Sequence, residues 1–232
     1  MSDSWDDLAE WWSREVQHDP AYAADVHPIL QELLPPELGV AMDLGCGEGQ
    51  GMRLVGGGDH VFGCDLSLGL LQRADARGRV VRTELPSLTW LEDAVLDSAF
   101  SVYLLDLIAD HDRFFSETAR VVKPGGSLVI VINHPVYTAP GSAPLMDEAG
   151  EVLWRWGTYF SEGSSFEPAG DGAVEFFHRS VETLLTTAAT RGWILDAMIE
   201  RGLSDDTIER LPGYEGQQNI PRLLGARWTR SA

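Results

Sequence analysis

The segment that most constrains the fold is residues 40–49, Val-Ala-Met-Asp-Leu-Gly-Cys-Gly-Glu-Gly. A short apolar run ends in Asp43, and glycine then recurs at every second position. The apolar run predicts a buried strand, and the glycines predict a sharp turn into a helix. Glycine has no Cβ atom, so this backbone can take positive φ and a ligand can lie directly against it. The segment therefore predicts a binding turn at the end of a strand.

Two common nucleotide motifs do not fit this turn. A phosphate-binding loop needs Gly-Lys-Ser/Thr, and no such sequence follows. The dinucleotide motif G-x-G-x-x-G would need its third glycine at Gln50 or at Met52. A glycine-rich turn without a ligand stays open as the plainer alternative.

The composition sets limits on partners and location. The net charge is −19, and Lys123 is the only lysine among 17 basic residues, with no basic cluster. Such a surface repels phosphate backbones, which argues against nucleic acids and anionic membranes as partners. The apolar runs are shorter than the roughly 20 residues that span a bilayer, and the N-terminus lacks the features of a signal peptide. We expect a cytoplasmic protein, a monomer or a homodimer.

The chain continues as alternating strands and helices, which predicts an α/β fold with a parallel sheet covered on both faces. The second strand, residues 60–64, ends at Asp65, which lies 20 residues after Gly45. A carboxylate at that distance can accept hydrogen bonds from both hydroxyls of a ribose. Ligands of such sheets bind outside the carboxyl ends of the strands.

Several motifs together resemble class I S-adenosylmethionine-dependent methyltransferases of the small-molecule type. They are Asp43-x-Gly45-x-Gly47-x-Gly49, the segment 63–67 (Gly-Cys-Asp-Leu-Ser) and the segment 123–126 (Lys-Pro-Gly-Gly). The resemblance implies a doubly wound, mostly parallel sheet of seven strands with an antiparallel last strand, helices on both faces and an N-terminal helical lid. It also implies S-adenosyl-L-methionine as the cofactor.

The resemblance carries over to individual positions. It implies cofactor contacts from the glycine turn, from the ends of the second and third strands and from the end of the fourth strand: Asp43, Gly45, Cys46, Gly47, Asp65, Leu66, Glu84, Leu85 and Ser101. Two positions depart from the family pattern. Glu84 stands where an aspartate is usual, and Leu107 stands where a histidine is usual.

We expect one domain with four parts. Residues 1–36 form a helical cap, 37–135 the cofactor-binding half, 136–175 an aromatic cover and 176–232 the completion of the sheet. The cover is rich in glycine and proline but also in aromatic residues, so it is folded rather than a disordered linker. A surface flap at a dimer interface is the alternative for this segment.

The expected reaction is methyl transfer to a small, partly apolar or aromatic molecule. Alignment of donor and acceptor supplies most of the rate for an activated methyl group, so no base is obligatory. His134, directly after the fifth strand, is the candidate base, with a hydrogen-bonded turn histidine as its alternative reading. His178 reads as structural, while Tyr137 and Tyr159 are candidates to orient the acceptor. No cluster with metal-ligand spacing is present, so no metal is expected.

Two other function classes remain open. One is an enzyme that binds S-adenosylmethionine on the same fold but performs non-methylating chemistry. The other is a non-catalytic ligand-binding or regulatory protein, since fold does not decide function.

Overall fold

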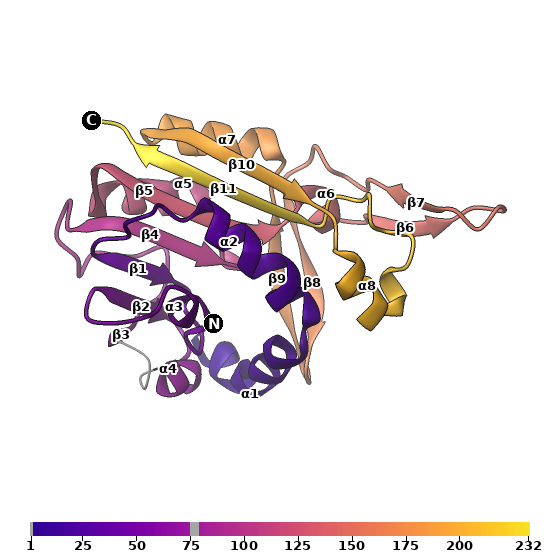
Figure 1. Ribbon diagram of the computed structural model, residues 1–232, viewed down its shortest axis with the longest axis horizontal. Helices are drawn as coiled ribbons and strands as arrows, with labels where there is room; N and C mark the ends of the chain where they lie inside the picture. Colours follow the sequence, from indigo (N-terminus) through magenta and orange to yellow (C-terminus); the bar gives the residue numbers. More distant parts are fainter. Residues whose placement is uncertain (1, 75–78) are drawn as a thin grey trace.

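The computed structural model describes residues 2–74 and 79–232. Its centre is a seven-stranded sheet with the order β10-β11-β5-β4-β1-β2-β3 (Figure 1). The strands are β1 (Ala41–Leu44), β2 (Val61–Asp65), β3 (Arg79–Arg82), β4 (Leu96–Val102), β5 (Val122–Asn133), β10 (Trp193–Arg201) and β11 (Leu223–Arg230). Only β11 runs against its neighbours, pairing antiparallel with both β5 and β10. The predicted mostly parallel sheet with an antiparallel last strand is confirmed.

Helices cover both faces of the sheet, as expected for a doubly wound fold. The helices are α1 (Ser2–His18), α2 (His27–Leu33), α3 (Gln50–Leu54), α4 (Leu68–Ala74), α5 (His111–Val121), α6 (Pro135–Thr138), α7 (Val181–Thr190) and α8 (Asp205–Arg210). A π-helical turn, Tyr22–Val26, leads into α2. All of the described helices are too short or too polar to cross a membrane.

Strand β5 shows why the chain has two cores. Leu128, Ile130 and Ile132 belong to the core shared with α5 and α7, whereas Val129 and Val131 belong to the core shared with α2 and α3. Successive side chains of a strand point to opposite faces, so a continuous apolar run has to be covered on both sides.

Helix α2 packs very closely on the sheet because β11 carries a glycine. A Cβ atom at Gly225 would lie 2.4 Å from Ile29 Cγ2 and 2.6 Å from Leu33 Cδ1. The N-terminal segment is thereby seated over β5 and β11, and α1 is directed back across the carboxyl ends of the strands (Figure 1).

The segment 123–126 follows helix α5, and it lies within β5 as an irregular stretch rather than as a separate turn before the strand. Helix α5 ends at Val121, and Gly125 has a φ of +78°. The pairing of β4 with β5 skips these residues, since Leu96 lies opposite Val122 and Ser98 opposite Ser127.

The aromatic cover is folded, as predicted, and consists of two antiparallel hairpins. These are β6 (Ala143–Met146) with β7 (Val152–Arg155), and β8 (Gly163–Ala169) with β9 (Gly172–His178). The β6–β7 hairpin projects from the end of the molecule, whereas the β8–β9 hairpin runs down to α1 (Figure 1). Leu8 and Trp11 of α1 pack on Ala169 and Val174 near the tip of that hairpin. The cover therefore closes a ring with α1 around the carboxyl ends of the strands.

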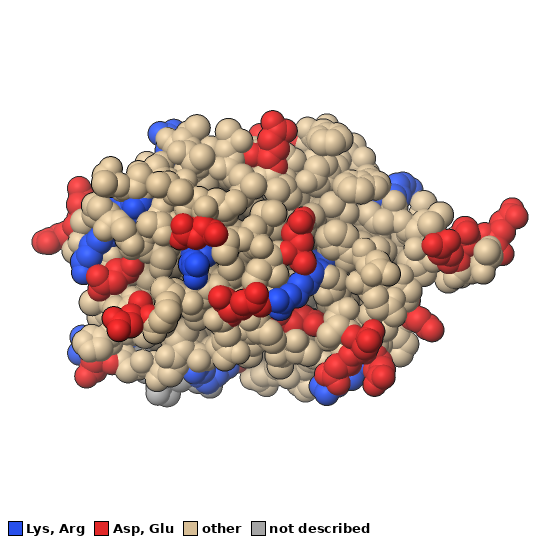
Figure 2. Space-filling model, turned by 45° about the horizontal axis from the view of Figure 1, so that its top comes forward, with Lys and Arg blue, Asp and Glu red and all other residues tan. Residues whose placement is uncertain are grey.

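The surface agrees with the composition. Figure 2 shows acidic side chains spread over one face, with basic ones scattered singly among them. No basic patch gathers on this face, so it offers no footprint for a nucleic acid backbone.

Candidate functional site

The glycine turn between β1 and α3 has the backbone conformation that its sequence predicts. Gly45, Gly47 and Gly49 have φ values of +72°, +53° and +82°, in the left-handed region that favours glycine. The turn is held against the neighbouring strand, because Gly45 N and Cys46 N both donate to Cys64 O. A Cβ atom at Gly45 would lie only 2.8 Å from Leu104 Cδ1. The turn is thus fixed in place and closely packed from behind.

Asp65 lies against this turn, as its spacing from Gly45 predicts. Its Oδ2 accepts a hydrogen bond from Gly47 N at 2.9 Å, and its Oδ1 accepts one from Ser67 N at 2.8 Å. Burial raises the pKa of Asp65, while these two backbone donors oppose the rise. Each carboxylate oxygen has a second acceptor position. The carboxylate can therefore take two further donors, one on each oxygen.

Asp43 lies beneath the turn and is almost fully buried. Burial, and after it the neighbouring Asp65 carboxylate, raises the pKa of Asp43 to about 8. Cys46 is also buried, and burial raises the pKa of its thiol. Both cysteines are free and buried, as small apolar side chains would be.

The other residues of the predicted cofactor set lie at the same edge with different exposure. Thr83 N, which follows β3, donates to Asp65 O at 2.9 Å. Glu84 follows β3 and is exposed, whereas Leu66 and Leu85 are half-buried. The ends of β2 and β3 are therefore adjacent.

Helix α1 covers the glycine turn directly. Trp12 Nε1 lies 3.7 Å from the position of a Cβ on Gly47, and Ser13 Oγ donates to Glu48. Asp6 Oδ1 accepts from Ser67 Oγ at 2.8 Å and from Gly69 N at 3.1 Å. The cavity left between α1 and the turn is about 20 Å³. That is about the space of one water molecule, so α1 is closed on the turn in this conformation.

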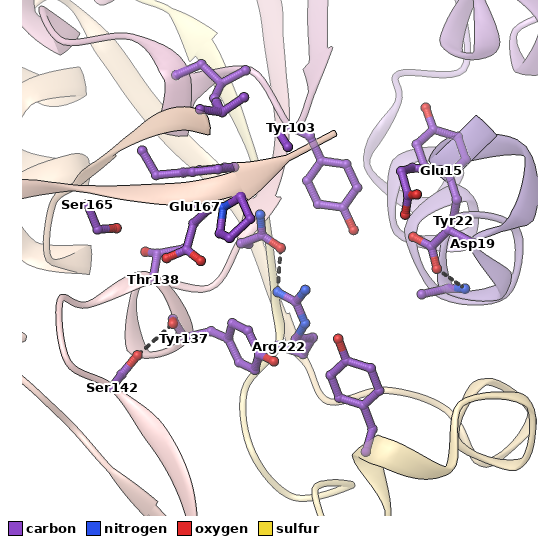
Figure 3. A pocket seen from close by; sticks show the side chains of 18 of the residues that line it. Glu15, Asp19, Tyr22, Tyr103, Tyr137, Thr138, Ser142, Ser165, Glu167 and Arg222 are labelled. Carbon is purple, nitrogen blue, oxygen red and sulfur yellow. Dashed lines mark hydrogen bonds between the residues drawn. The ribbon is translucent and has the colours of Figure 1, made fainter. Parts of the chain in front are cut away.

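A much larger cavity of about 720 Å³ opens beside the turn. Its walls come from α1, the ends of β4 and β5, both hairpins of the cover and the segment 203–222 (Figure 3). Nine aromatic residues contribute to the wall: Trp5, Trp11, Trp12, Tyr22, Tyr103, Tyr137, Trp154, Phe176 and Tyr214. Four residues, Trp12, Val16, Tyr22 and Tyr103, line both the large and the small cavity. A ligand in the large cavity thus lies next to whatever the turn binds.

Tyr103 is the site residue that the sequence reasoning missed. It follows β4 directly and has a φ of +54°, a left-handed conformation that is uncommon and strained for tyrosine. Burial raises the pKa of its phenol. The position directly after the fourth strand was the available signal, because the carboxyl ends of the strands face the ligand.

Two predicted residues are fully or almost fully buried. Ser101 is fully buried, its Oγ has no hydrogen-bond partner among the described residues, and it shares its strand face with Ala99, which packs in the core beneath α5 and α7. His134, the candidate base, is 2% exposed and is absent from the walls of both cavities. His134 Nδ1 accepts from Val136 N at 3.1 Å, and Nε2 lies 2.7 Å from Glu200 Oε1. Both ring nitrogens are therefore engaged, and the turn-histidine alternative is the one that fits.

The other candidates near the acceptor side divide clearly. His178 Nε2 bonds to Tyr159 O at 2.8 Å, which supports its structural reading. Tyr159 OH accepts from Val181 N, so this tyrosine anchors the cover. Tyr137 does line the large cavity, where burial raises its pKa to about 12.

The residues at the turn fit the implied cofactor chemically. The backbone around Gly45 and Gly47 leaves no side chain between the chain and a ligand, and Asp65 retains acceptor positions for two hydroxyls. The small cavity of about 20 Å³ at the turn does not by itself hold a nucleoside.

Comparison with known proteins gives a consistent result. The profile of a family described as "Methyltransferase domain" matches residues 42–130. A 2-phytyl-1,4-naphtoquinone methyltransferase of Nostoc punctiforme is 35% identical over 107 residues, which cover 40% of this chain and 46% of that protein. The chain spans less than half the length of the curated relatives it matches.

Solved structures extend the similarity over nearly the whole chain. An S-adenosylmethionine-dependent methyltransferase from Mesorhizobium loti is 29% identical, with a TM-score of 0.76 and coverage of 88% of this chain and 96% of that one. A second structure, from Listeria monocytogenes, shares the fold with a TM-score of 0.77 at 24% identity, over 91% of this chain and 100% of that one.

Proposed function

Because the chain belongs to the class I S-adenosylmethionine-dependent methyltransferases, we propose that it transfers the methyl group of S-adenosyl-L-methionine to a small, partly apolar or aromatic acceptor. The observation that carries the acceptor class is the cavity of about 720 Å³ with nine aromatic residues in its wall. Cavities of this volume suit small organic molecules. The naphthoquinone in the name of the Nostoc relative supports the same class.

The cofactor is assigned to the glycine turn and the adjoining strand ends. The backbone of Gly45 and Gly47 would lie against it, Asp65 would accept from its ribose hydroxyls, and Leu66, Glu84 and Leu85 would border its adenine. Asp43 and Cys46 support the turn from within the core. When bound, the cofactor supplies a methyl group already activated on a sulfonium.

The remaining parts of the chain have the task of placing the acceptor. Residues 1–36 act as the lid over the cofactor, and 136–175 act as the cover of the acceptor cavity. Tyr103 borders both cavities and is placed to orient the acceptor at their junction. Exclusion of water and alignment of the two molecules can lower the barrier by about 7–11 kcal/mol without a base.

The first experiment is a calorimetric titration of the purified protein with S-adenosylhomocysteine. We expect micromolar binding to the wild type. Asp65→Ala removes two acceptors that carry charge and should weaken binding at least about 30-fold. Asp59→Ala is the matched control, because its side chain is 90% exposed and its ion pair with Arg79 is long, at 4.0 Å. Urea unfolding of each variant shows whether weaker binding comes from the lost contact or from a less stable protein.

The second experiment distinguishes methyl transfer from the alternatives. The protein is incubated with methyl-labelled cofactor and a panel of phenols, quinols, amines and aromatic acids, and S-adenosylhomocysteine is quantified. Its accumulation with label in one acceptor supports the proposal. Consumption of an acceptor without S-adenosylhomocysteine would instead indicate non-methylating chemistry on this fold. Absence of binding to the wild type at millimolar S-adenosylhomocysteine would refute the cofactor assignment.

A further inference from the structure

We propose that Arg222 binds a carboxylate on the methyl acceptor, so that the acceptor is a small aromatic acid. This inference rests on the proposed function for the identity of the ligand as an acceptor, but the anion site itself is defined by the cavity. Arg222 is the single arginine or lysine among the described residues that line the 720 Å³ cavity (Figure 3). In a chain with net charge −19, one cation placed on an aromatic wall is a specific feature.

The Arg222 guanidinium is held in place by neutral partners. Its Nη1 donates to Asn133 Oδ1, and Asn133 Nδ2 in turn bonds to Asp106 Oδ2 at 3.4 Å. Its central carbon lies 3.8 Å from the centre of the Tyr137 ring. Within residues 2–74 and 79–232, Arg222 forms no ion pair with a carboxylate. An arginine stacked on an aromatic face keeps its N–H edge available for a planar, bidentate anion.

The backbone of Arg222 is equally well fixed. Arg222 N donates to Arg201 O, and Arg222 O accepts from His134 N, both at 2.8 Å. The residue is therefore held between the ends of β10 and β5 before β11 begins. A cation that is already positioned loses less entropy when it binds an anion.

The charge of Arg222 acts across the cavity. It opposes the rise in pKa that burial causes at Tyr137, Asp19 and Tyr103. All three of these side chains line the cavity. An acidic group placed among them would be stabilised in its ionised form by the same field.

Three acidic side chains also line the cavity and have to be weighed. Glu15 and Glu167 are exposed to solvent, so their fields are screened. Asp19 is half-buried, and its Oδ1 accepts from Ala21 N at 2.9 Å (Figure 3). The charge of Arg222 reaches both Asp19 and the buried Asp106, but among the described residues neither carboxylate forms an ion pair with its guanidinium. The acidic groups therefore leave the surroundings of Arg222 suited to an anion.

The test compares three probes of one shape and different charge: 2-naphthoate, 2-naphthamide and 2-naphthylmethylamine. Their dissociation constants are measured at pH 7.5 by calorimetry, supported by quenching of tryptophan fluorescence. We expect the wild type to bind the carboxylate about 10-fold or more tightly than the amide, as one charge-assisted hydrogen bond supplies. Arg222→Gln should abolish this preference, and Arg222→Lys should keep part of it.

Arg113→Gln is the matched control, because it removes the same charge from an exposed position of α5 outside the cavity. Equal binding of carboxylate and amide by the wild type, preferred binding of the amine, or an unchanged preference in Arg222→Gln would overturn the proposal. If Arg222→Gln does not fold, the affinities of the wild type and Arg222→Lys are compared instead. Lysine cannot form the bidentate contact, so Arg222→Lys should bind the carboxylate more weakly and the amide equally well. S-adenosylhomocysteine is titrated into the same proteins. If the protein binds S-adenosylhomocysteine but shows no preference for the carboxylate, only this inference is refuted. If it prefers the carboxylate but does not bind S-adenosylhomocysteine, only the proposed function is refuted.

Discussion

Replacing His134 by alanine should destabilise the protein without affecting the cofactor site. The substitution removes the cap of α6, worth about 1 kcal/mol, and a hydrogen bond to the partly exposed Glu200 carboxylate, worth about 1 kcal/mol after screening. Loss of a ring that is 2% exposed leaves a cavity that costs about 1 kcal/mol more. A total of about 3 kcal/mol lowers the Tm by about 6–12 °C in a chain of this size.

The assay is urea and thermal unfolding followed by tryptophan fluorescence, with His60→Ala as the control at an exposed histidine. Affinity for S-adenosylhomocysteine should stay within about 2-fold of wild type. Burial lowers the pKa of His134, although Glu200 opposes this. Its contribution to stability is therefore present above the unfolded pKa of about 6.5 and is lost as the pH falls through the folded pKa. A His134→Ala protein with wild-type stability and no methyl transfer would refute this reasoning and restore His134 as the base.

Three further predictions concern the turn and its lid. Gly45→Ala should lower the free energy of unfolding more than Gly56→Ala. Both glycines have positive φ, but a Cβ atom at Gly45 would meet Leu104, whereas no heavy atom of the described residues lies within 4 Å of a Cβ at Gly56. Equal urea midpoints for the two variants would contradict this. The pKa of Asp43 is raised in the folded state, so stability should fall as the pH rises from about 4 toward 8, and Asp43→Asn should flatten that slope in unfolding titrations. Asp6→Asn should raise hydrogen exchange in α1 several-fold. Because the pKa of Asp6 is lowered by its hydrogen bonds to Gly69 and Ser67, acid should have the same effect in the wild type as the pH falls below 3.8, through the folded pKa.

The cofactor side of the site could be predicted because its information is local. The turn conformation follows from glycines at 45, 47 and 49, and the place of Asp65 follows from one strand–helix–strand unit. Parallel neighbours in a sheet bring the ends of consecutive strands together, so the hydrogen bond from Gly47 to Asp65 is a consequence of the sequence pattern.

His134 and Ser101 could not be assigned in the same way. The partner that occupies His134 Nε2 is Glu200, 66 residues later, and no local pattern indicates that contact. For Ser101, the strand end can be located from an apolar run, but which face the side chain takes depends on the packing of both layers. For His134, a long-range contact decides between two readings that were equal in sequence.

The acceptor cavity depends even more on distant contacts, and this explains where specificity lies in such a chain. Arg222 joins the wall through Asn133 at the end of β5 and Tyr137 at the start of the cover, residues separated from it by more than 80 positions. Only the order of the sheet, with β11 inserted between β5 and β10, brings them together. Changes in the cover or in the segment before β11 can therefore alter the acceptor while the turn and Asp65 stay intact. The donor site is encoded by one motif, whereas the acceptor site is encoded by the topology that closes the sheet.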